Sequence, residues 1–159
     1  MISVKFITLG TLKESYLREA AAEYEKRLGA FCKMQMIQLK EEKLSDAPSE
    51  GEIRQALDRE AQKIMAEIPP RAYKIAMCVE GKQLSSEELA AKLEEVSERY
   101  GDVCFIIGSS HGLSDSVKNA CDMRLSVSKL TFPHQLMRVL LLEAVYRGFN
   151  IMKGTKYHK

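Results

Sequence analysis

The sequence predicts an α/β protein in which helices cover both faces of a mostly parallel sheet. Short apolar segments alternate along the whole chain with segments whose apolar residues recur every three or four positions. One strand-like run, Val103–Ile107, is apolar at all five positions, as in parallel strands that are buried on both faces. The resulting order, βαβαβαβαβα, is the pattern of a parallel sheet.

Glycine and proline residues mark the boundaries of the elements in the first half. Gly10 ends the first strand, Gly29 ends the first helix, and Pro69 and Pro70 end the second helix. A polar loop from Lys40 to Gly51 precedes that second helix. The expected order is strand, helix, strand and helix, at residues 2–9, 12–28, 31–39 and 53–68.

In the second half, Gly81 is expected to turn the chain after a short strand. Ser85 and Glu88 then form the spacing of a capping box, which begins a helix that Gly101 closes. Pro133 suits the start of the last helix, because its fixed backbone angle matches the first helical turn. The expected strands lie at residues 74–79, 103–107 and 123–127, and the last two helices at 114–121 and 134–152.

The size and charge of the chain fit one folded domain with an anionic partner. The chain has 159 residues, and 45% of them are hydrophobic, which is enough to form a core. The net charge is only +2, but it is unevenly spread. Residues 129–159 hold six Lys or Arg and one acid, Glu143, whereas the rest of the chain holds 18 basic and 21 acidic residues. A basic end on an acidic body suggests an anionic partner.

Several classes of protein are excluded by composition. The longest apolar run, 136–145, is interrupted by Arg138 and Glu143 and falls well short of the roughly 20 residues of a membrane span. No signal peptide is visible at Met1. Four isolated cysteines predict a reduced, cytoplasmic protein. Because none of the three histidines has ligand spacing to a cysteine, no metal site is expected.

Ligands of open α/β sheets bind beyond the carboxyl ends of the strands, where three loops stand out: Glu80–Lys82, Gly108–Gly112 and Ser128–Pro133. The middle loop has the Gly-x-Ser-x-Gly spacing of a serine hydrolase nucleophile elbow, with Ser110 as the nucleophile. Its triad would need Asp115 or Asp122 and His134 or His158. The chain is short for that fold, so we favour a glycine turn that lets the backbone approach a ligand.

The last expected helix is apolar around most of its circumference, which indicates burial in the domain or against another subunit. Its polar residues form two stripes, one of His134 and Arg138 and one of Glu143, Arg147 and Asn150. Glu143 and Arg147 fit either an ordinary ion pair or a functional role. We predict a homodimer that forms through this helix.

The most specific block of the sequence runs from Leu125 through Thr131-Phe132-Pro133-His134 to Tyr146-Arg147, and the closing pair is Tyr157-His158. Further characteristic segments are Gly10, Glu23–Leu28, Gly81-Lys82, Phe105–Gly108 and Gly112-Leu113. In these residues the chain resembles the RlmH (YbeA-like) family of SPOUT methyltransferases, and the similarity covers essentially its whole length.

The resemblance implies a single SPOUT domain over residues 1–159, with a Rossmann-like sheet and a C-terminal trefoil knot. It implies a homodimer with S-adenosyl-L-methionine bound in the knot. The implied reaction is methylation of N3 of a pseudouridine in 23S ribosomal RNA within the assembled 70S ribosome. A SPOUT enzyme that acts on transfer RNA and a non-catalytic ribosome-binding factor are the alternatives.

The resemblance also assigns cofactor-binding residues, and one nearby position departs from the family. The family usually has two glycines where this chain has Gly108-Ser109, so cofactor affinity should fall if the second position needs a positive φ. Met77 often corresponds to leucine in relatives. The cofactor residues implied are Met77, Gly108, Val127, Ser128, Lys129, Leu130, Thr131, Phe132 and Pro133.

For methyl transfer, the N3–H group of the acceptor must lose its proton, so a base or a cation near the acceptor should help. His134 and four residues expected to be catalytic are the candidates. We predict that Tyr157-His158 lies on the RNA side of the site and reaches across the dimer; its polarity alone would suggest only a flexible tail. The four catalytic candidates are Arg138, Arg147, Tyr157 and His158.

Overall fold

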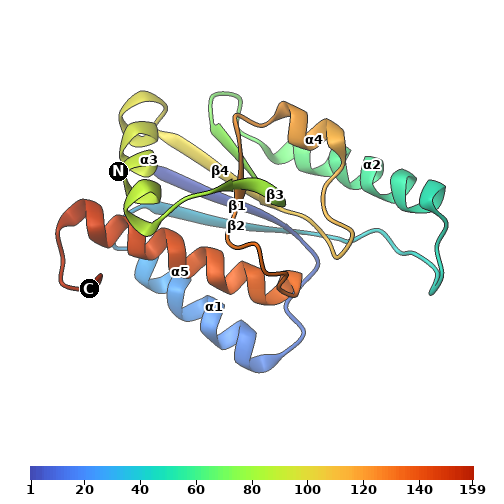
Figure 1. Cartoon of the computed structure of the whole chain (residues 1–159), viewed down its shortest axis with the longest axis horizontal. Coiled ribbons are helices and arrows are strands. Elements are labelled where there is room, and N and C mark those ends of the chain that lie inside the picture. The colour runs from blue at the N-terminus through green and yellow to red at the C-terminus, as the bar shows by residue number, and fades with distance from the viewer.

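The computed structural model describes residues 1–159 and contains five strands and five helices in the predicted order (Figure 1). The strands form one sheet in the order β2-β1-β4-β3-β5, and every pairing is parallel. The α/β prediction is therefore confirmed. The strands are β1 (Ser3–Leu9), β2 (Lys33–Leu39), β3 (Tyr73–Gln83), β4 (Asp102–Ile107) and β5 (Met123–Ser126).

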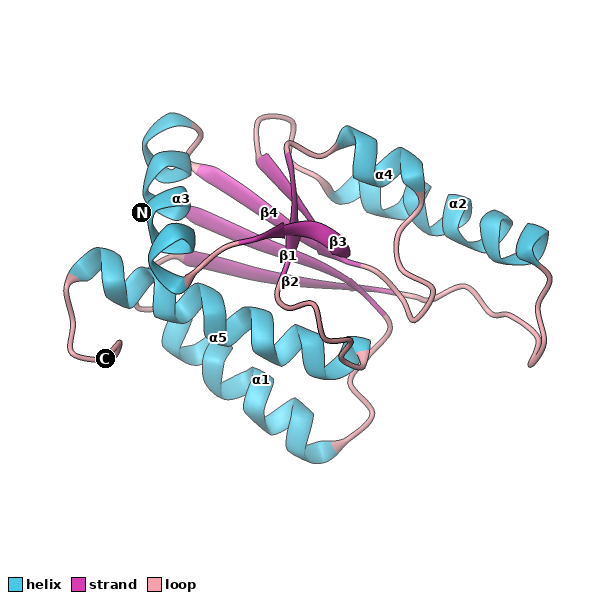
Figure 2. Cartoon of the chain, viewed as in Figure 1, coloured by secondary structure: helices cyan, strands magenta, loops and turns pink.

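Helices cover both faces of this sheet, as predicted. Figure 2 shows α1, α3 and α5 on one face and α2 and α4 on the other. None of the helices is both long and apolar enough to cross a membrane. The helices are α1 (Ser15–Leu28), α2 (Glu50–Glu67), α3 (Ser86–Arg99), α4 (Asp115–Ala120) and α5 (His134–Lys153).

The position of β4 in the centre of the sheet explains its apolar sequence. Alternate side chains of a strand point to opposite faces, and here both faces are covered. Phe105 and Ile107 belong to the core under α1, α3 and α5, whereas Cys104 and Ile106 belong to the core under α2 and α4. Phe105 also stacks on Phe6 of β1, with ring centroids 5.3 Å apart. The run Val103–Ile107 is apolar because all five of its side chains are buried.

Two helices begin with capping boxes that satisfy their first backbone N–H groups. Ser85 and Glu88 cap α3 as predicted, and Ser49 and Glu52 do the same for α2. Helix α5 ends at Gly154, which adopts a left-handed conformation with φ of 67°. The predicted bounds of the last helix, 134–152, are correct to within one residue.

The expected turn at Gly81 is wrong. Strand β3 continues to Gln83, and its register with β5 shifts between Met77 and Lys82. A Cβ atom at Gly81 would lie 2.6 Å from the carbonyl carbon of Leu125 in β5. Glycine is therefore required for a close approach of two strands, and the chain does not reverse there.

Candidate functional site

A cavity of about 680 Å³ lies beyond the carboxyl ends of β4 and β5 and beside Met77–Glu80 in the middle of β3. Its walls combine apolar side chains such as Met77, Leu125 and Phe132 with the polar loop that follows β4. Lys129 belongs to the same loop as most of the predicted cofactor residues but does not line the cavity. The other eight do line it: Met77, Gly108, Val127, Ser128, Leu130, Thr131, Phe132 and Pro133.

The loop after β4 folds back on itself at the mouth of this cavity. The N–H group of Gly112 donates a hydrogen bond to the carbonyl of Ser109 at 2.8 Å. Gly112 has φ of 83°, which a residue with a Cβ rarely adopts. A Cβ atom on Gly108 would overlap the carbonyl group of Gly112. Both glycines are therefore needed to close the loop.

Ser109, which replaces a family glycine, is accommodated without backbone strain. No residue other than glycine has a positive φ, so this position does not need one. The Ser109 side chain is buried, and its hydroxyl donates to Oε1 of Glu60 in α2 at 3.3 Å. Oε2 of Glu60 accepts from the backbone N–H of Glu42 at 2.9 Å. The effect of Ser109 on cofactor affinity stays a prediction.

Burial raises the pKa of the Glu60 carboxyl, while the hydrogen bonds from Glu42 and Ser109 act in the opposite direction. Sequence analysis missed this residue. The signal was present, because Ala56 and Ile64, four residues away on either side, are buried and place Glu60 on the apolar face of α2. A carboxylate on that face must find hydrogen-bond donors inside the protein.

The loop that connects β5 to α5 forms the opposite wall of the cavity. The Ser126 hydroxyl donates to the carbonyl of Ser128 at 2.9 Å, and the hydroxyl of Ser128 accepts from the N–H of Leu130 at 3.0 Å. These local bonds turn the loop, so that Leu130 is 70% exposed beside the cavity. Pro133 then begins α5.

The hydrolase alternative lacks a triad. Ser110 and His134 both line the cavity, but no hydrogen bond joins Ser110 to His134 or His134 to Asp115. Asp122 precedes β5, at the amino end of the strands, where its carboxylate accepts from the backbone N–H of Lys74 at 2.8 Å. His158 bonds to Glu87 instead of a serine. The glycine-turn interpretation explains the motif better. No group of three or more His, Cys, Asp or Glu side chains is placed to hold a metal ion.

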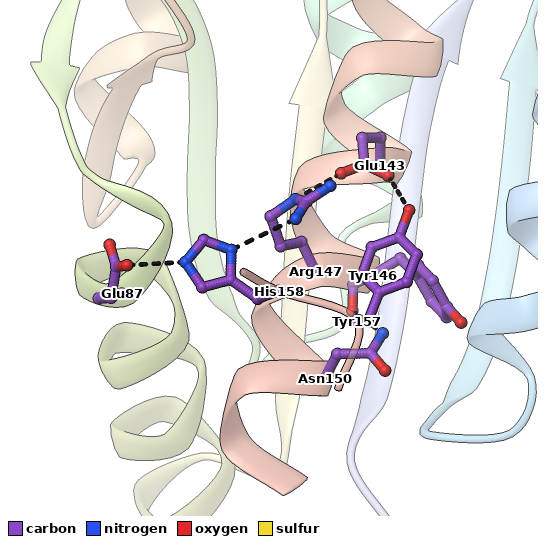
Figure 3. Close-up of polar contacts among 7 residues, drawn as sticks. All are labelled: Glu87, Glu143, Tyr146, Arg147, Asn150, Tyr157 and His158. Carbon is purple, nitrogen blue, oxygen red and sulfur yellow. Dashed lines mark hydrogen bonds and ion pairs between the residues drawn. The ribbon is translucent and has the colours of Figure 1, made fainter. Parts of the chain in front are cut away.

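A second polar cluster joins the last residues of the chain to α5 and α3 (Figure 3). Nε of Arg147 donates to Glu143 at 2.7 Å, and the hydroxyl of Tyr157 donates to the other Glu143 oxygen at 2.7 Å. His158 lies between Nη1 of Arg147, at 3.3 Å, and Glu87 of α3, at 2.8 Å. Three of the four predicted catalytic residues therefore share one network, which we call the tail network: Glu87, Glu143, Arg147, Tyr157 and His158.

Contacts within the tail network favour the protonated form of the Tyr157 phenol. The hydrogen bond to Glu143, together with burial, raises the pKa of Tyr157 well above its usual range. The same carboxylate raises the pKa of Arg147, whose guanidinium lies 4.7 Å from the centroid of the Tyr157 ring. The hydrogen bond with His158 lowers the pKa of Glu87. In this arrangement Tyr157 is a hydrogen-bond donor, and a base for the acceptor proton would have to be another group.

The tail network and the cavity contact different parts of α5. The cavity meets the helix at His134 and Met137 in its first turn, whereas the network contacts its middle at Glu143 and Arg147. Along the helix axis, Met137 is about 9 Å from Glu143 and about 15 Å from Arg147. Figure 1 shows the C-terminus beside the far end of α5. A single protomer therefore does not bring Tyr157 and His158 to its own cavity.

Comparison with known families decides the class of protein. A family model described as "Predicted SPOUT methyltransferase" matches residues 2–158. The chain belongs to the SPOUT methyltransferase family. Its cavity lies at the edge of the sheet where ligands of α/β folds bind.

The curated relatives of this SPOUT chain extend over its whole length. A ribosomal RNA large subunit methyltransferase H from Streptococcus thermophilus (strain CNRZ 1066) is 50% identical, with 99% of this chain and 100% of the relative covered. Enzymes of the same name from Leuconostoc mesenteroides and Streptococcus suis are 46% and 45% identical over the same shares. A solved structure of a probable methylase family protein from Haemophilus influenzae Rd KW20 shares the fold, with a TM-score of 0.57 and 16% identity over 100% of this chain and 72% of that one.

Arg138 is the predicted catalytic residue that the structure places apart from the other three. It is only 2% exposed, and its Nη2 donates to the carbonyl groups of Gly10, at 3.0 Å, and Leu9, at 3.4 Å. Nη1 donates to the side chain of Gln38 at 3.1 Å, whereas the buried Nε has no partner. Burial lowers the pKa of Arg138, and nearby Glu25 opposes that shift. These contacts favour a positioning role at the end of β1; a catalytic role stays a prediction.

Proposed function

We propose that this SPOUT methyltransferase uses S-adenosyl-L-methionine to methylate N3 of a pseudouridine in 23S ribosomal RNA on the assembled 70S ribosome. The observation that carries the proposal is the 50% identity, over the whole chain, to a ribosomal RNA large subunit methyltransferase H. The SPOUT family model and the cavity at the carboxyl edge of the sheet support a methyl donor of this kind.

The proposed cofactor site is the cavity of about 680 Å³ beyond β4 and β5 and beside the middle of β3. Its volume lies in the range of small-molecule sites, and its mixture of apolar walls and loop backbone suits an adenosyl group with a polar tail. Met77, Gly108 and the loop Val127–Pro133 would hold the cofactor there; Lys129 is kept as a prediction only. When bound, the cofactor supplies an electrophilic methyl group on a sulfonium.

The residues of the chain would act by positioning the acceptor and managing its proton. The methyl group would pass from the sulfonium to N3, the electron pair of the broken S–methyl bond would stay on sulfur, and the N3 proton would pass to solvent water. The guanidinium of Arg147 would stabilise negative charge on the acceptor base, and Tyr157 and His158 would hydrogen-bond to it. Arg138 would position the end of β1.

A homodimer would bring the tail network of one protomer to the cavity of its partner. The separation of these two regions along α5 supports this, since in one protomer Arg147 lies about 15 Å along the helix from Met137, which borders the cavity. α5 also keeps Leu136, Leu140 and Ala144 partly exposed at four-residue spacing, which is one face of the helix. We propose that this face meets the second copy.

We further propose that residues 1–159 act as one domain in the cytoplasm and that the C-terminal segment forms the trefoil knot of the family. Strands from the whole chain enter one sheet, which supports a single domain. The close backbone approach of Gly81 to Leu125 supports tight threading near β5. A ribosomal substrate and four free cysteines support the cytoplasm.

The direct test is transfer of a labelled methyl group to 70S ribosomes, separate subunits and transfer RNA, followed by mapping of the modified nucleoside. Label at N3 of one 23S pseudouridine, from 70S ribosomes only, is the expected result. Label in transfer RNA would instead identify a SPOUT enzyme of different substrate. If calorimetry detects no binding of S-adenosyl-L-methionine and no RNA is labelled, a non-catalytic ribosome-binding factor replaces the enzyme.

A further inference from the structure

A second cavity, of about 560 Å³, lies beyond the carboxyl ends of β1 and β2. It shares Ser110 and His134 with the proposed cofactor cavity, so the two spaces adjoin. It also lies where the topology of the sheet reverses, because the chain leaves β1 toward β2 on one side and leaves β4 toward β5 on the other. Ligands of open α/β sheets bind at this kind of switch point.

The lining of the second cavity is polar and mainly basic. Lys13 and Lys40 carry its formal positive charges, Glu41 is its single carboxylate, and Leu39 is its one apolar residue. Lys13 and Lys40 are exposed and form no ion pair. The start of α5 borders the cavity without a side-chain cap, so its free backbone N–H groups add positive potential. This lining suits a polar anion.

The floor of the cavity is held in place from below by the buried Arg138. Its guanidinium donates to Gln38 and to the carbonyl of Gly10, and both of these residues line the cavity. The N–H group of Lys13 donates to the side chain of Gln135 in α5 at 3.0 Å. The loop after β1 is therefore fixed to α5 at two points, which explains why a buried arginine occurs where it contacts no cofactor residue.

In-line methyl transfer requires the acceptor atom to approach from a space that is continuous with the donor cavity. We propose that the second cavity binds the acceptor nucleotide of the RNA, with Lys13 and Lys40 on its phosphate groups and the base directed past Ser110 and His134 toward the methyl donor. This inference rests on the proposed function. It makes Lys13 and Lys40 substrate-binding residues and Arg138 a positioning residue.

The test is the double variant K13A/K40A, assayed for binding to 70S ribosomes with S-adenosylhomocysteine present and for methyl transfer at varied ribosome concentration. Ribosome affinity and KM for ribosomes should worsen on the order of tenfold, because two phosphate contacts are lost. The slope of log affinity against log salt should become shallower by about 1.4 to 1.8. K13R/K40R should restore all three.

The matched control is K33A/R71A, which removes two exposed charges at the opposite edge of the sheet and should bind ribosomes as the wild type does. Calorimetric affinity for S-adenosyl-L-methionine should stay within about twofold in every variant, since the lysines lie outside the cofactor cavity. Unchanged ribosome binding by K13A/K40A would overturn the inference. So would a loss of cofactor binding equal to the loss of ribosome binding.

The two proposals fail in different ways. If wild-type protein methylates ribosomes and K13A/K40A does so with the same KM and salt slope, only the acceptor cavity is rejected. If wild-type protein binds ribosomes through these lysines but transfers no methyl group, the cavity is retained as an RNA site and the proposed reaction is rejected.

Discussion

Two regions along α5 differ in the chemistry of the residues that surround them. At its first turn, the cavity is formed by loop backbone, glycines and apolar side chains, and shape rather than charge defines it. At its middle, around Glu143 and Arg147, the tail network joins two carboxylates, a guanidinium, an imidazole and a phenol. A methyl donor that is already reactive needs a cavity of matching shape, whereas an acceptor that loses a proton needs polar groups nearby. In the proposed function, one helix therefore carries both halves of the site, at different points along its length.

The largest effect should come from removing the C-terminal residues of the tail network. Deletion of residues 157–159 should abolish methyl transfer, by at least about 100-fold, because the hydrogen-bonding groups of the acceptor side are lost. Cofactor affinity measured by calorimetry should change less than about twofold, since none of the proposed cofactor-binding residues lies in the deleted segment. Deletion of Lys159 alone is the control. Normal turnover by the longer deletion would leave the tail without a role in the reaction.

The next largest effect should come from changing the shape of the cofactor cavity. G108A adds a Cβ where the carbonyl of Gly112 already lies, so the loop must shift. Cofactor affinity should fall on the order of tenfold to 100-fold in calorimetry, with a lower melting temperature. G51A, in the first turn of α2 with no close neighbour, should have neither effect. An unchanged dissociation constant for G108A would show that the loop does not shape the cofactor site.

A smaller effect should follow from uncharging the tail network. In E143Q the phenol of Tyr157 loses its carboxylate partner, so its pKa should fall toward its usual value of about 10. Because the folded-state pKa of Tyr157 is raised, its contribution to stability is complete below about pH 10 and is lost as pH rises toward the folded-state value. Wild-type protein should therefore lose stability above pH 10 more steeply than E143Q. Ultraviolet titration would measure the pKa of Tyr157, and unfolding at several pH values would measure the stability. E87Q is the control, because it leaves the bond between Tyr157 and Glu143 in place. Parallel stability curves for wild type and E143Q would contradict the role of Glu143 in raising this pKa.

The smallest effect should come from Ser109. S109A removes the hydroxyl that donates to Glu60 and should cost about 1 kcal/mol of unfolding free energy. Cofactor affinity should change only a few-fold, because the backbone of the loop is closed by Gly112 rather than by this hydroxyl. S109G, which introduces the glycine that the family resemblance leads us to expect, should match S109A in affinity. A loss of affinity tenfold or greater in S109A would make the Glu60 contact part of the cofactor site.

Much of the fold was predictable because its signals are local. The apolar run of β4, the capping box of Ser85 and the proline before α5 each act within a few residues, and all three predictions are confirmed. Gly81 was misinterpreted because the same residue type serves turns and close strand contacts, and only the partner strand distinguishes them.

The sequence predicts which residues form the candidate site better than it predicts how those residues are arranged in space. Eight of the nine cofactor candidates border one cavity, since they follow neighbouring parallel strands. The burial of Arg138 under Gly10 and the bond between Ser109 and Glu60 join segments far apart in the chain, so no spacing rule reveals them. Nor does the sequence show that Tyr157 and His158 fold back onto α5, away from the cavity of their own protomer.

The most direct measurement is complementation between two inactive variants. Protein that lacks residues 157–159 keeps the cavity, and G108A keeps the tail network, so a mixed dimer would join one intact cavity to one intact tail. At an S-adenosyl-L-methionine concentration too low to occupy the G108A cavity, methyl transfer to 70S ribosomes should reappear when the two are unfolded and refolded together, and it should be absent when they are merely mixed and assayed before exchange. No gain in methyl transfer after joint refolding under these conditions, with mixed dimers demonstrated by mass spectrometry, would contradict a site shared between protomers.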